Sequence, residues 1–482
     1  MDEDEITEIT TDGDTTNTIA KYGSTSQASD EKLLELNEIY EMIGLGPAQY
    51  LYWTLVALVA YSDYAELTVM AVILPSLRCE WGLTAGFEAA ITISTYGSYA
   101  LFAIMFGKVS DIYGRKTVIQ WSTLLLLFAA IGGALSPNKW VFLATRLVTG
   151  ACIGINLSCI VCYTAEFAES KYRVYGVLGF IFGAHGSIGI VSGVAFLVLN
   201  NVGWQWLIII VSLPAIPALI LILALPESPR FLCVSGQQEK AMKAVRTMAK
   251  LNRRELQKDI RMACFNDEKL GSYTKILNKD NRKSTIALSV MYFCDIFIGF
   301  GLIVWLPLIY SANMCGDVKT AQHENTCQSL TQGDLLKLTI ATVASLSGSI
   351  AAVILVPRIG RLIPMRVATF IMLLSIATLF VCVNDSFTFA TTIIAKIVET
   401  FVNTTLWIMI PESFPTCIRS TATGFINSCG KIGGVFGTAC VYLLFYVSPY
   451  SVVGIFLFIS FVGFVGTMVY DRETKYEILQ EK

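Results

Sequence analysis

Long apolar stretches alternate with short polar segments along most of the chain. Twelve stretches approach the roughly 20 residues that a helix needs to cross a bilayer, and they centre near residues 62, 97, 127, 153, 186, 214, 297, 345, 374, 398, 433 and 460. Strands are not expected, because a lone strand leaves its backbone unsatisfied in lipid and no barrel-like alternation appears. The pattern predicts an all-α membrane protein with twelve transmembrane helices.

A polar stretch at 226–283 divides these helices into two sets of six. It holds 14 Lys and Arg against seven Asp and Glu. We therefore expect five regions: an acidic, mostly disordered cytosolic tail at 1–46, a first six-helix half at 47–225, a basic cytosolic linker with short helices at 226–283, a second six-helix half at 284–470 and a cytosolic tail at 471–482.

Basic residues are distributed unequally between the two sides. The linker and the loops on its side hold 23 Lys and Arg, whereas the opposite loops hold only Arg78, Lys139, Lys319 and Lys337. Because basic loops stay in the cytosol, both termini are expected there. The pattern leaves open whether the membrane is the plasma membrane or an intracellular vesicle.

Composition supports a protein embedded in the bilayer. Hydrophobic residues make up 54% of the 482 residues, charged residues 15%, and the mean hydropathy is +0.60. A net charge of -2 gives no support for a nucleic-acid partner. No nucleotide loop, catalytic Ser/His/Asp set or metal-ligand spacing is visible, so neither an enzyme nor a cofactor is expected. Cys315 and Cys327, in one polar loop, are disulfide candidates, with their pairing left open.

An internal repeat supports the division into two halves. An offset of 246 residues relates four pairs of identical residues: Gly114 and Gly360, Arg115 and Arg361, Glu166 and Glu412, and Arg173 and Arg419. Repeated halves of this kind are typical of transporters whose halves rock around a site near the membrane midplane.

The loop GKVSDIYGRK, 107–116, resembles the loop between the second and third helices of the major facilitator superfamily. RLVTGACIG (146–154), PESPRFL (226–232) and PESFPTCIRSTATGF (411–425) resemble motifs of its sugar and organic-ion porters. The chain is also similar to the branch that contains synaptic vesicle glycoproteins. The resemblance implies a latch between Asp111 and Arg115, and a cytosolic gate built from Gly107, Asp111, Gly114, Arg115, Glu166, Arg173, Glu227, Arg230, Arg361, Glu412 and Arg419.

The first apolar segment carries two carboxylates, Asp63 and Glu66. They are three residues apart, hence on one helix face, and a charge at the bilayer centre costs at least about 2.5 to 3.5 kcal/mol. Arg146 is the expected partner of Asp63, and the resemblance implies that this pair couples proton binding to transport. The alternative is a static network that only fixes helix packing.

The second half contributes Asp295, Lys396, Glu399 and Lys431 inside apolar segments. Lys396 and Glu399 are expected to neutralise each other in part. The glutamine pair that hexose porters place in the seventh helix is replaced here by a segment with Asp295, which disfavours a hexose. We predict that an organic ion contacts charges and aromatic faces from Glu66, Asp295, Tyr64, Tyr292, Trp305, Trp407, Glu399 and Lys431.

His185 is the only histidine in an apolar segment, and it is either a proton relay or a packed helix residue. Together these patterns predict a monomeric transporter in the lipid bilayer that moves a small organic solute, more an ion than a sugar, by alternating access with proton coupling. The alternative is a transporter-like vesicle protein with a binding or regulatory role and no transport.

Overall fold

A computed structural model of the chain describes residues 32–34, 36–167, 172–257, 260–262, 277–312, 330–381, 384–414, 416–445 and 447–473. The disulfide candidates Cys315 and Cys327 lie outside these residues. Almost all of the described chain is α-helical, as the apolar pattern predicts.

The first half contains the six predicted segments, the last of them divided in two. Its helices are α2 (Pro47–Trp81), α3 (Ala85–Tyr113), α4 (Arg115–Ala134), α5 (Lys139–Ala165), α6 (Arg173–Val202), α7 (Trp204–Ser212) and α8 (Ala215–Ala224). The division falls at Leu213 and Pro214. Proline has no backbone N–H, so it interrupts the hydrogen-bond ladder of a helix.

The second half repeats the pattern with unbroken helices. They are α12 (Lys279–Ala312), α14 (Gln332–Ile359), α15 (Leu362–Thr378), α16 (Asp385–Glu412), α17 (Thr416–Phe445) and α18 (Pro449–Val469). Helix α12 begins inside the stretch that the sequence assigns to the linker. The described residues include ten spans that are long and apolar enough to cross a membrane. The shorter α15 and the long α3 complete the predicted twelve.

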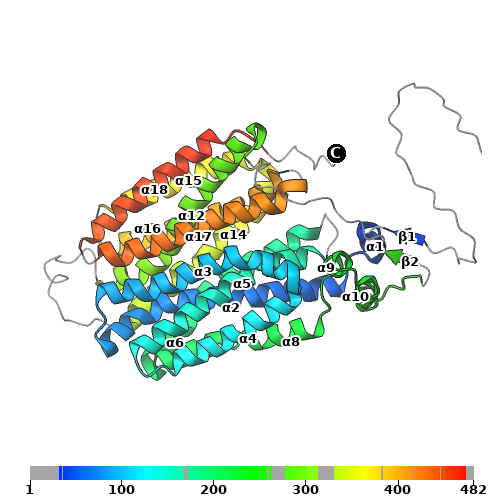
Figure 1. Ribbon diagram of the computed structural model, residues 1–482. Helices are drawn as coiled ribbons and strands as arrows, with labels where there is room; N and C mark the ends of the chain where they lie inside the picture. Colours follow the sequence, from blue (N-terminus) through cyan, green and yellow to red (C-terminus); the bar gives the residue numbers. More distant parts are fainter. Residues whose placement is uncertain are drawn as a thin grey trace, which may run out of the picture.

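Equivalent helices pack together in each half. In the first half α2 lies against α6 and α3 against α5, and in the second half α12 lies against α17 and α14 against α16. The two halves meet where α3 contacts α17, α6 contacts α14 and α2 contacts α12 (Figure 1). The contact surface between the halves is therefore also repeated, which is the arrangement that rocking about a central axis requires.

Two glycines bring equivalent helices of the two halves into close contact. A Cβ at Gly183 of α6 would overlap the carbonyl oxygen of Ala57 in α2, and a Cβ at Gly437 of α17 would overlap that of Phe297 in α12. These are the same helix pair in the two halves. The glycine-rich segment around His185 is thus a close helix contact, as the sequence suggests.

One end of the helix bundle, which we call the linker end, carries the small elements of residues 32–43 and 226–262. These are β1 (Lys32–Leu34), α1 (Leu36–Ile43), α9 (Pro229–Val234), α10 (Gln238–Leu251) and β2 (Ile260–Met262) (Figure 1). Strands β1 and β2 are parallel, and the Tyr40 hydroxyl donates to the backbone oxygen of Glu166 at 2.5 Å. The described part of the predicted tail is therefore folded onto the linker, and the strand pair has no counterpart in the sequence prediction.

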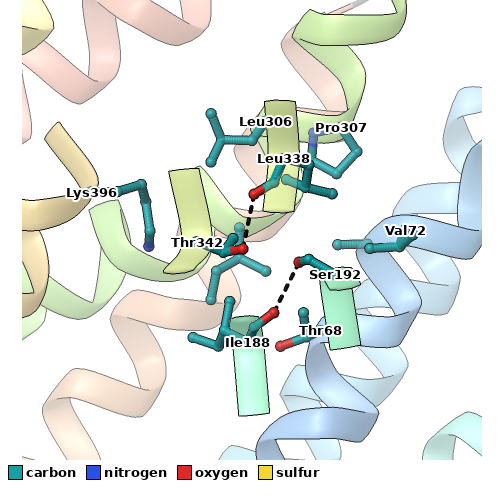
Figure 2. A pocket seen from close by; sticks show the side chains of 11 residues that line it. Thr68, Val72, Ile188, Ser192, Leu306, Pro307, Leu338, Thr342 and Lys396 are labelled. Carbon is teal, nitrogen blue, oxygen red and sulfur yellow. Dashed lines mark hydrogen bonds between the residues drawn. The ribbon is translucent and has the colours of Figure 1, made fainter. Parts of the chain in front are cut away.

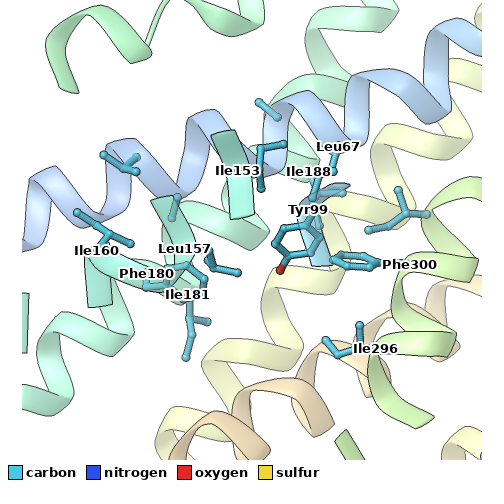
Figure 3. Packing of buried hydrophobic residues seen from close by; sticks show 14 of the residues in the cluster. Leu67, Tyr99, Ile153, Leu157, Ile160, Phe180, Ile181, Ile188, Ile296 and Phe300 are labelled. Atoms are coloured by element: carbon cyan, nitrogen blue, oxygen red, sulfur yellow. The ribbon is translucent and has the colours of Figure 1, made fainter. Parts of the chain in front are cut away.

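The apolar core continues from one half into the other. Figure 3 shows Tyr99 of α3, Leu157 of α5, Phe180 of α6 and Phe300 of α12 in this core, to which all four belong. All four side chains are buried. The charged residues described below therefore lie in surroundings with little access to water.

Candidate functional site

The buried arginine of the first half is paired with a glutamate. Arg146 Nη1 of α5 lies 2.9 Å from Glu66 Oε2 of α2, and Ser212 Oγ of α7 donates to Glu66 Oε1 at 2.6 Å. The predicted pairing of Arg146 with Asp63 is therefore wrong in this conformation. Helices α2 and α5 run in opposite directions, and Glu66 is one turn nearer to the end at which α5 begins.

Asp63 has an amide as its partner instead. Its Oδ1 accepts a hydrogen bond from Asn156 Nδ2 at 3.0 Å, while its Oδ2 is buried with no hydrogen-bond partner. The Asn156 side-chain oxygen accepts in turn from Ser122 and from Thr123. Asp63 thus sits near the Arg146–Glu66 ion pair, and among the described residues it is bonded to no cation of its own.

The second half contains a matching pair on helices α12 and α16. Asp295 Oδ2 accepts from Asn403 Nδ2 at 2.7 Å, and Asp295 Oδ1 is buried without a partner. Lys396 Nζ lies 2.8 Å from Glu399 Oε2, which confirms the predicted neutralisation. Each half therefore holds two buried carboxylates against one cation in this network.

Aromatic rings from both halves meet at the centre. Tyr64 contacts Phe180 with ring centroids 6.1 Å apart, Phe180 contacts Trp407 at 5.1 Å, and Trp407 contacts Tyr292 at 6.2 Å. The structure thus links three of the four predicted aromatic residues in one chain of ring contacts through Phe180, a residue that was not selected from the sequence. We call these four residues the aromatic cluster.

Trp305, the remaining aromatic candidate, has a different environment. Its ring contacts Phe456 of α18 at 5.9 Å, within the second half, and the side chain is fully buried. The structure therefore separates Trp305 from the aromatic cluster.

Lys431 and His185, both selected from the sequence, make polar contacts between the halves. Lys431 of α17 is half-buried, and its Nζ lies 5.4 Å from the ring centroid of Tyr99 on α3. His185 Nδ1 of α6 lies 2.8 Å from Ser349 Oγ of α14. Both contacts join helix pairs that form the interface between the halves, so a rocking motion changes them.

The centre is closed in this conformation. A cavity of about 10 Å³ lies between the halves, bordered by Thr68, Ser192, Thr342 and Lys396 among others (Figure 2). The Ser192 and Thr342 hydroxyls donate to backbone oxygens of their own helices. Ligand pockets usually enclose about 300 to 1,000 Å³, so this cavity is far too small for an organic solute.

The predicted gate residues of the first half form a network at the linker end. Arg115 is ion-paired with Glu166, and Ser228 donates to Glu166. Glu227 accepts from the backbone N–H groups of Lys116 and of Ser228, each at 3.0 Å. The Glu227 side chain thereby satisfies one exposed amide at the start of α4 and one immediately before α9.

The second half repeats this network 246 residues later. Arg361 makes two bonds to Glu412, at 2.9 and 3.0 Å. Glu473 accepts from the backbone N–H groups of Arg361 and Leu362 at 2.9 and 3.0 Å. Glu473 was not selected from the sequence, although the same offset applied to Glu227 leads directly to it.

Among the other predicted gate residues, Arg230 is exposed. The surroundings of Gly107 and the side chains of Asp111, Arg173 and Arg419 lie outside what the structure describes, so the proposed latch between Asp111 and Arg115 stays a prediction.

Comparison with known proteins gives a consistent result. The family model described as "Sugar (and other) transporter" matches residues 89–481. "Putative transporter svop-1" of Caenorhabditis elegans is 26% identical over 455 residues, which cover 92% of this chain and 86% of that protein. "Synaptic vesicle 2-related protein" of Xenopus laevis is 26% identical over 460 residues, with 92% and 82% covered.

The fold has solved counterparts. The xylose transporter XylE from E. coli, in a partially occluded inward-open conformation, superposes with a TM-score of 0.68 at 16% identity and covers 89% of this chain and 98% of that chain. This likeness shows the major facilitator fold that the motifs predict. The family model, the svop-1 protein and XylE are all described as transporters, and none of these findings points to an enzyme.

Proposed function

The chain belongs to the sugar (and other) transporter family, and from this premise we propose that it carries a small organic ion across a membrane by proton-coupled alternating access. The repeated helix contacts support the motion, because both halves meet through equivalent surfaces. The closed centre supports an occluded stage between two open ones.

The observation that carries proton coupling is the buried, unpartnered Oδ2 of Asp63. Glu66 already neutralises Arg146, so an ionised Asp63 leaves one uncompensated negative charge in the closed bundle. Burying such a charge is costly, and protonation removes the cost. The closed conformation therefore favours the protonated carboxyl, and opening to water favours proton release. This difference lets a proton gradient bias the direction of the conformational change.

The aromatic cluster and Lys431 are the proposed contacts for the solute. Rings from both halves converge there, so a solute bound between them contacts both moving bodies. Aromatic faces suit a cationic group, whereas Lys431 suits an anionic group. Glu66 and Glu399 are each engaged by a cation in this conformation, so they meet the solute only after those pairs rearrange.

We further propose that the linker end faces the cytosol and that the monomer is the transport unit. The basic residues of the linker side support this orientation. The synaptic vesicle 2-related relatives support an intracellular vesicle as the membrane.

Uptake into proteoliposomes tests the proposal. Uptake of a mixed panel of organic cations, carboxylates and sugars is measured for wild type, Asp63→Asn and Asp385→Asn. Each protein is assayed with and without an inward proton gradient. Asp385 is an exposed carboxylate at the start of α16 and controls for the substitution itself. We expect gradient-driven uptake of one ionic class in wild type and in Asp385→Asn, and its loss in Asp63→Asn.

The second candidate is a vesicle protein that binds a ligand without transporting it. The tightly closed centre and the names of the relatives favour it. It predicts that folded protein takes up no member of the panel, while a ligand still raises its melting temperature by binding one conformation.

A further inference from the structure

Each half of the protein holds a buried aspartate at the same helix position. Asp63 lies twelve residues before Pro75 inside α2, and Asp295 lies twelve residues before Pro307 inside α12. The offset between the halves is 232 residues for both pairs. Asp295 is thus the counterpart of Asp63 in the second half.

The hydrogen bonds of the two aspartates match as well. Asn156 and Asn403 both donate from the fourth long helix of their halves, to one carboxylate oxygen each, at 3.0 and 2.7 Å. The other oxygen of each aspartate is buried without a hydrogen-bond partner. One free, buried oxygen per half is the atom at which a proton adds without breaking an existing bond.

The charges around Asp295 leave it uncompensated. The titratable groups of the described chain that interact electrostatically with Asp295, from the packed helices and from α12 itself, are Lys396, Glu399, Tyr64, Tyr292 and Cys294. The only cation among them, Lys396, is bonded to Glu399. An ionised Asp295 therefore adds a net negative charge to the closed second half, as Asp63 does to the first.

A cavity connects Asp295 to polar groups nearer the linker end. It has a volume of about 30 Å³, above the 10 to 15 Å³ or so that a water molecule needs. Thr369 of α15 and Ser460 and Thr467 of α18 border it. Thr467 lies within one turn of the end of α18. A water molecule in this cavity would reach Asp295 from within the second half, separately from the aromatic cluster.

We propose that Asp295 is a second proton-binding site, so that each half of the transporter carries one titrating carboxyl group. A proton from water bonds to Oδ1, while Oδ2 keeps the hydrogen bond from Asn403. Hard metal cations prefer several oxygen ligands, whereas Met291, Cys294, Met365 and Met372, which carry no side-chain oxygen, line much of this cavity. The assignment replaces the expected role of Asp295 as a solute contact, and it extends the proposed function.

Infrared difference spectroscopy of the full chain in liposomes, recorded as pH is raised, tests this proposal without any solute. The readout is the carbonyl-stretch band of protonated carboxylic acids. We expect two buried components in wild type, loss of one in Asp63→Asn, loss of the other in Asp295→Asn, and no change in Asp385→Asn. An unchanged spectrum in folded Asp295→Asn overturns the proposal, and so does a component that follows added Na⁺ at constant pH.

A second variant decides the matter if Asp295→Asn does not fold. Asn403→Leu removes the donor that stabilises the ionised form. The component from Asp295 then persists to higher pH, while the component from Asp63 stays where it is. No shift in Asn403→Leu contradicts the proposal. Because the measurement needs no transport, a failure of Asp295 to bind protons is distinct from a failure of the protein to transport.

Discussion

The guanidinium of Arg146 donates to the carboxylate of Glu66 at 2.9 Å, and both side chains are almost completely buried. This contact joins α2 to α5 and uses the positive charge of Arg146. Asp63, three residues earlier in α2, is left with a neutral partner, Asn156. The proposed proton site follows from this difference: Glu66 is paired with a cation, whereas Asp63 is not.

We predict that Arg146→Met destabilises the protein strongly, because it leaves Glu66 buried without its cation. Breaking a buried ion pair costs about 3 to 5 kcal/mol, whereas replacing both partners is often nearly neutral. Adding Glu66→Gln to Arg146→Met should therefore restore most of the lost thermal stability. Adding Asp63→Asn instead should restore less. Equal rescue by the two second substitutions would contradict the pairing.

The two tryptophans should respond differently to truncation. Trp305→Ala removes a ring from the interior of the second half, and we expect a loss of about 3 to 5 kcal/mol in the free energy of unfolding. Trp407→Ala removes a ring of the aromatic cluster, so we expect a raised KM for uptake with a smaller change in melting temperature. Melting temperature and KM for uptake are measured for both variants. Equal changes in the two variants would contradict the assignment of the aromatic cluster to the solute site.

Gly183 and Gly186 provide a test of the α2–α6 contact. Gly183→Ala forces a methyl group against the Ala57 carbonyl, whereas the position at Gly186 has no atom within 4 Å. Overpacking of this kind costs about 1 to 3 kcal/mol. We expect a lower melting temperature for Gly183→Ala and an unchanged one for Gly186→Ala. Comparable effects at both positions would argue against the close contact.

Glu227 and Glu473 accept hydrogen bonds at the starts of α4 and α15, respectively, and we predict that each stabilises its own helix independently of the other. Replacing Glu473 by Gln weakens the bonds to the amides of Arg361 and Leu362, by roughly 1 kcal/mol, or about fivefold in local hydrogen exchange. Exchange at the start of α4 should stay constant. Glu227→Gln should give the reverse pattern, and parallel changes at both helices would refute two separate networks.

The helices and the two ion-pair networks at the linker end could be predicted from the sequence, because hydropathy indicates the helices and a constant offset relates Arg115 and Glu166 to Arg361 and Glu412. The apolar pattern located every long helix, and the offset that relates Arg115 to Arg361 would also have found Glu473 from Glu227. The strand pair β1 and β2 was not predicted, because three residues are too few to show the alternation of apolar and polar positions that identifies a strand.

Pairings between helices were harder to predict. Choosing Glu66 over Asp63 for Arg146 requires the relative heights of α2 and α5, which the sequence does not contain. Asp295 and Asn403 were overlooked as a pair for a similar reason. The offset is 232 residues for the aspartates and 247 for the asparagines, so unequal loop lengths hide the repeat.

The central claim is that Asp63 couples protons to solute movement, and comparing exchange with accumulation in Asp63→Asn tests it most directly. Proteoliposomes loaded with the solute that the panel identifies are assayed for counterflow and for uptake driven by an inward proton gradient. The account predicts that Asp63→Asn retains counterflow, because the solute contacts are intact, and loses gradient-driven accumulation. Accumulation at the wild-type level in folded Asp63→Asn would contradict it.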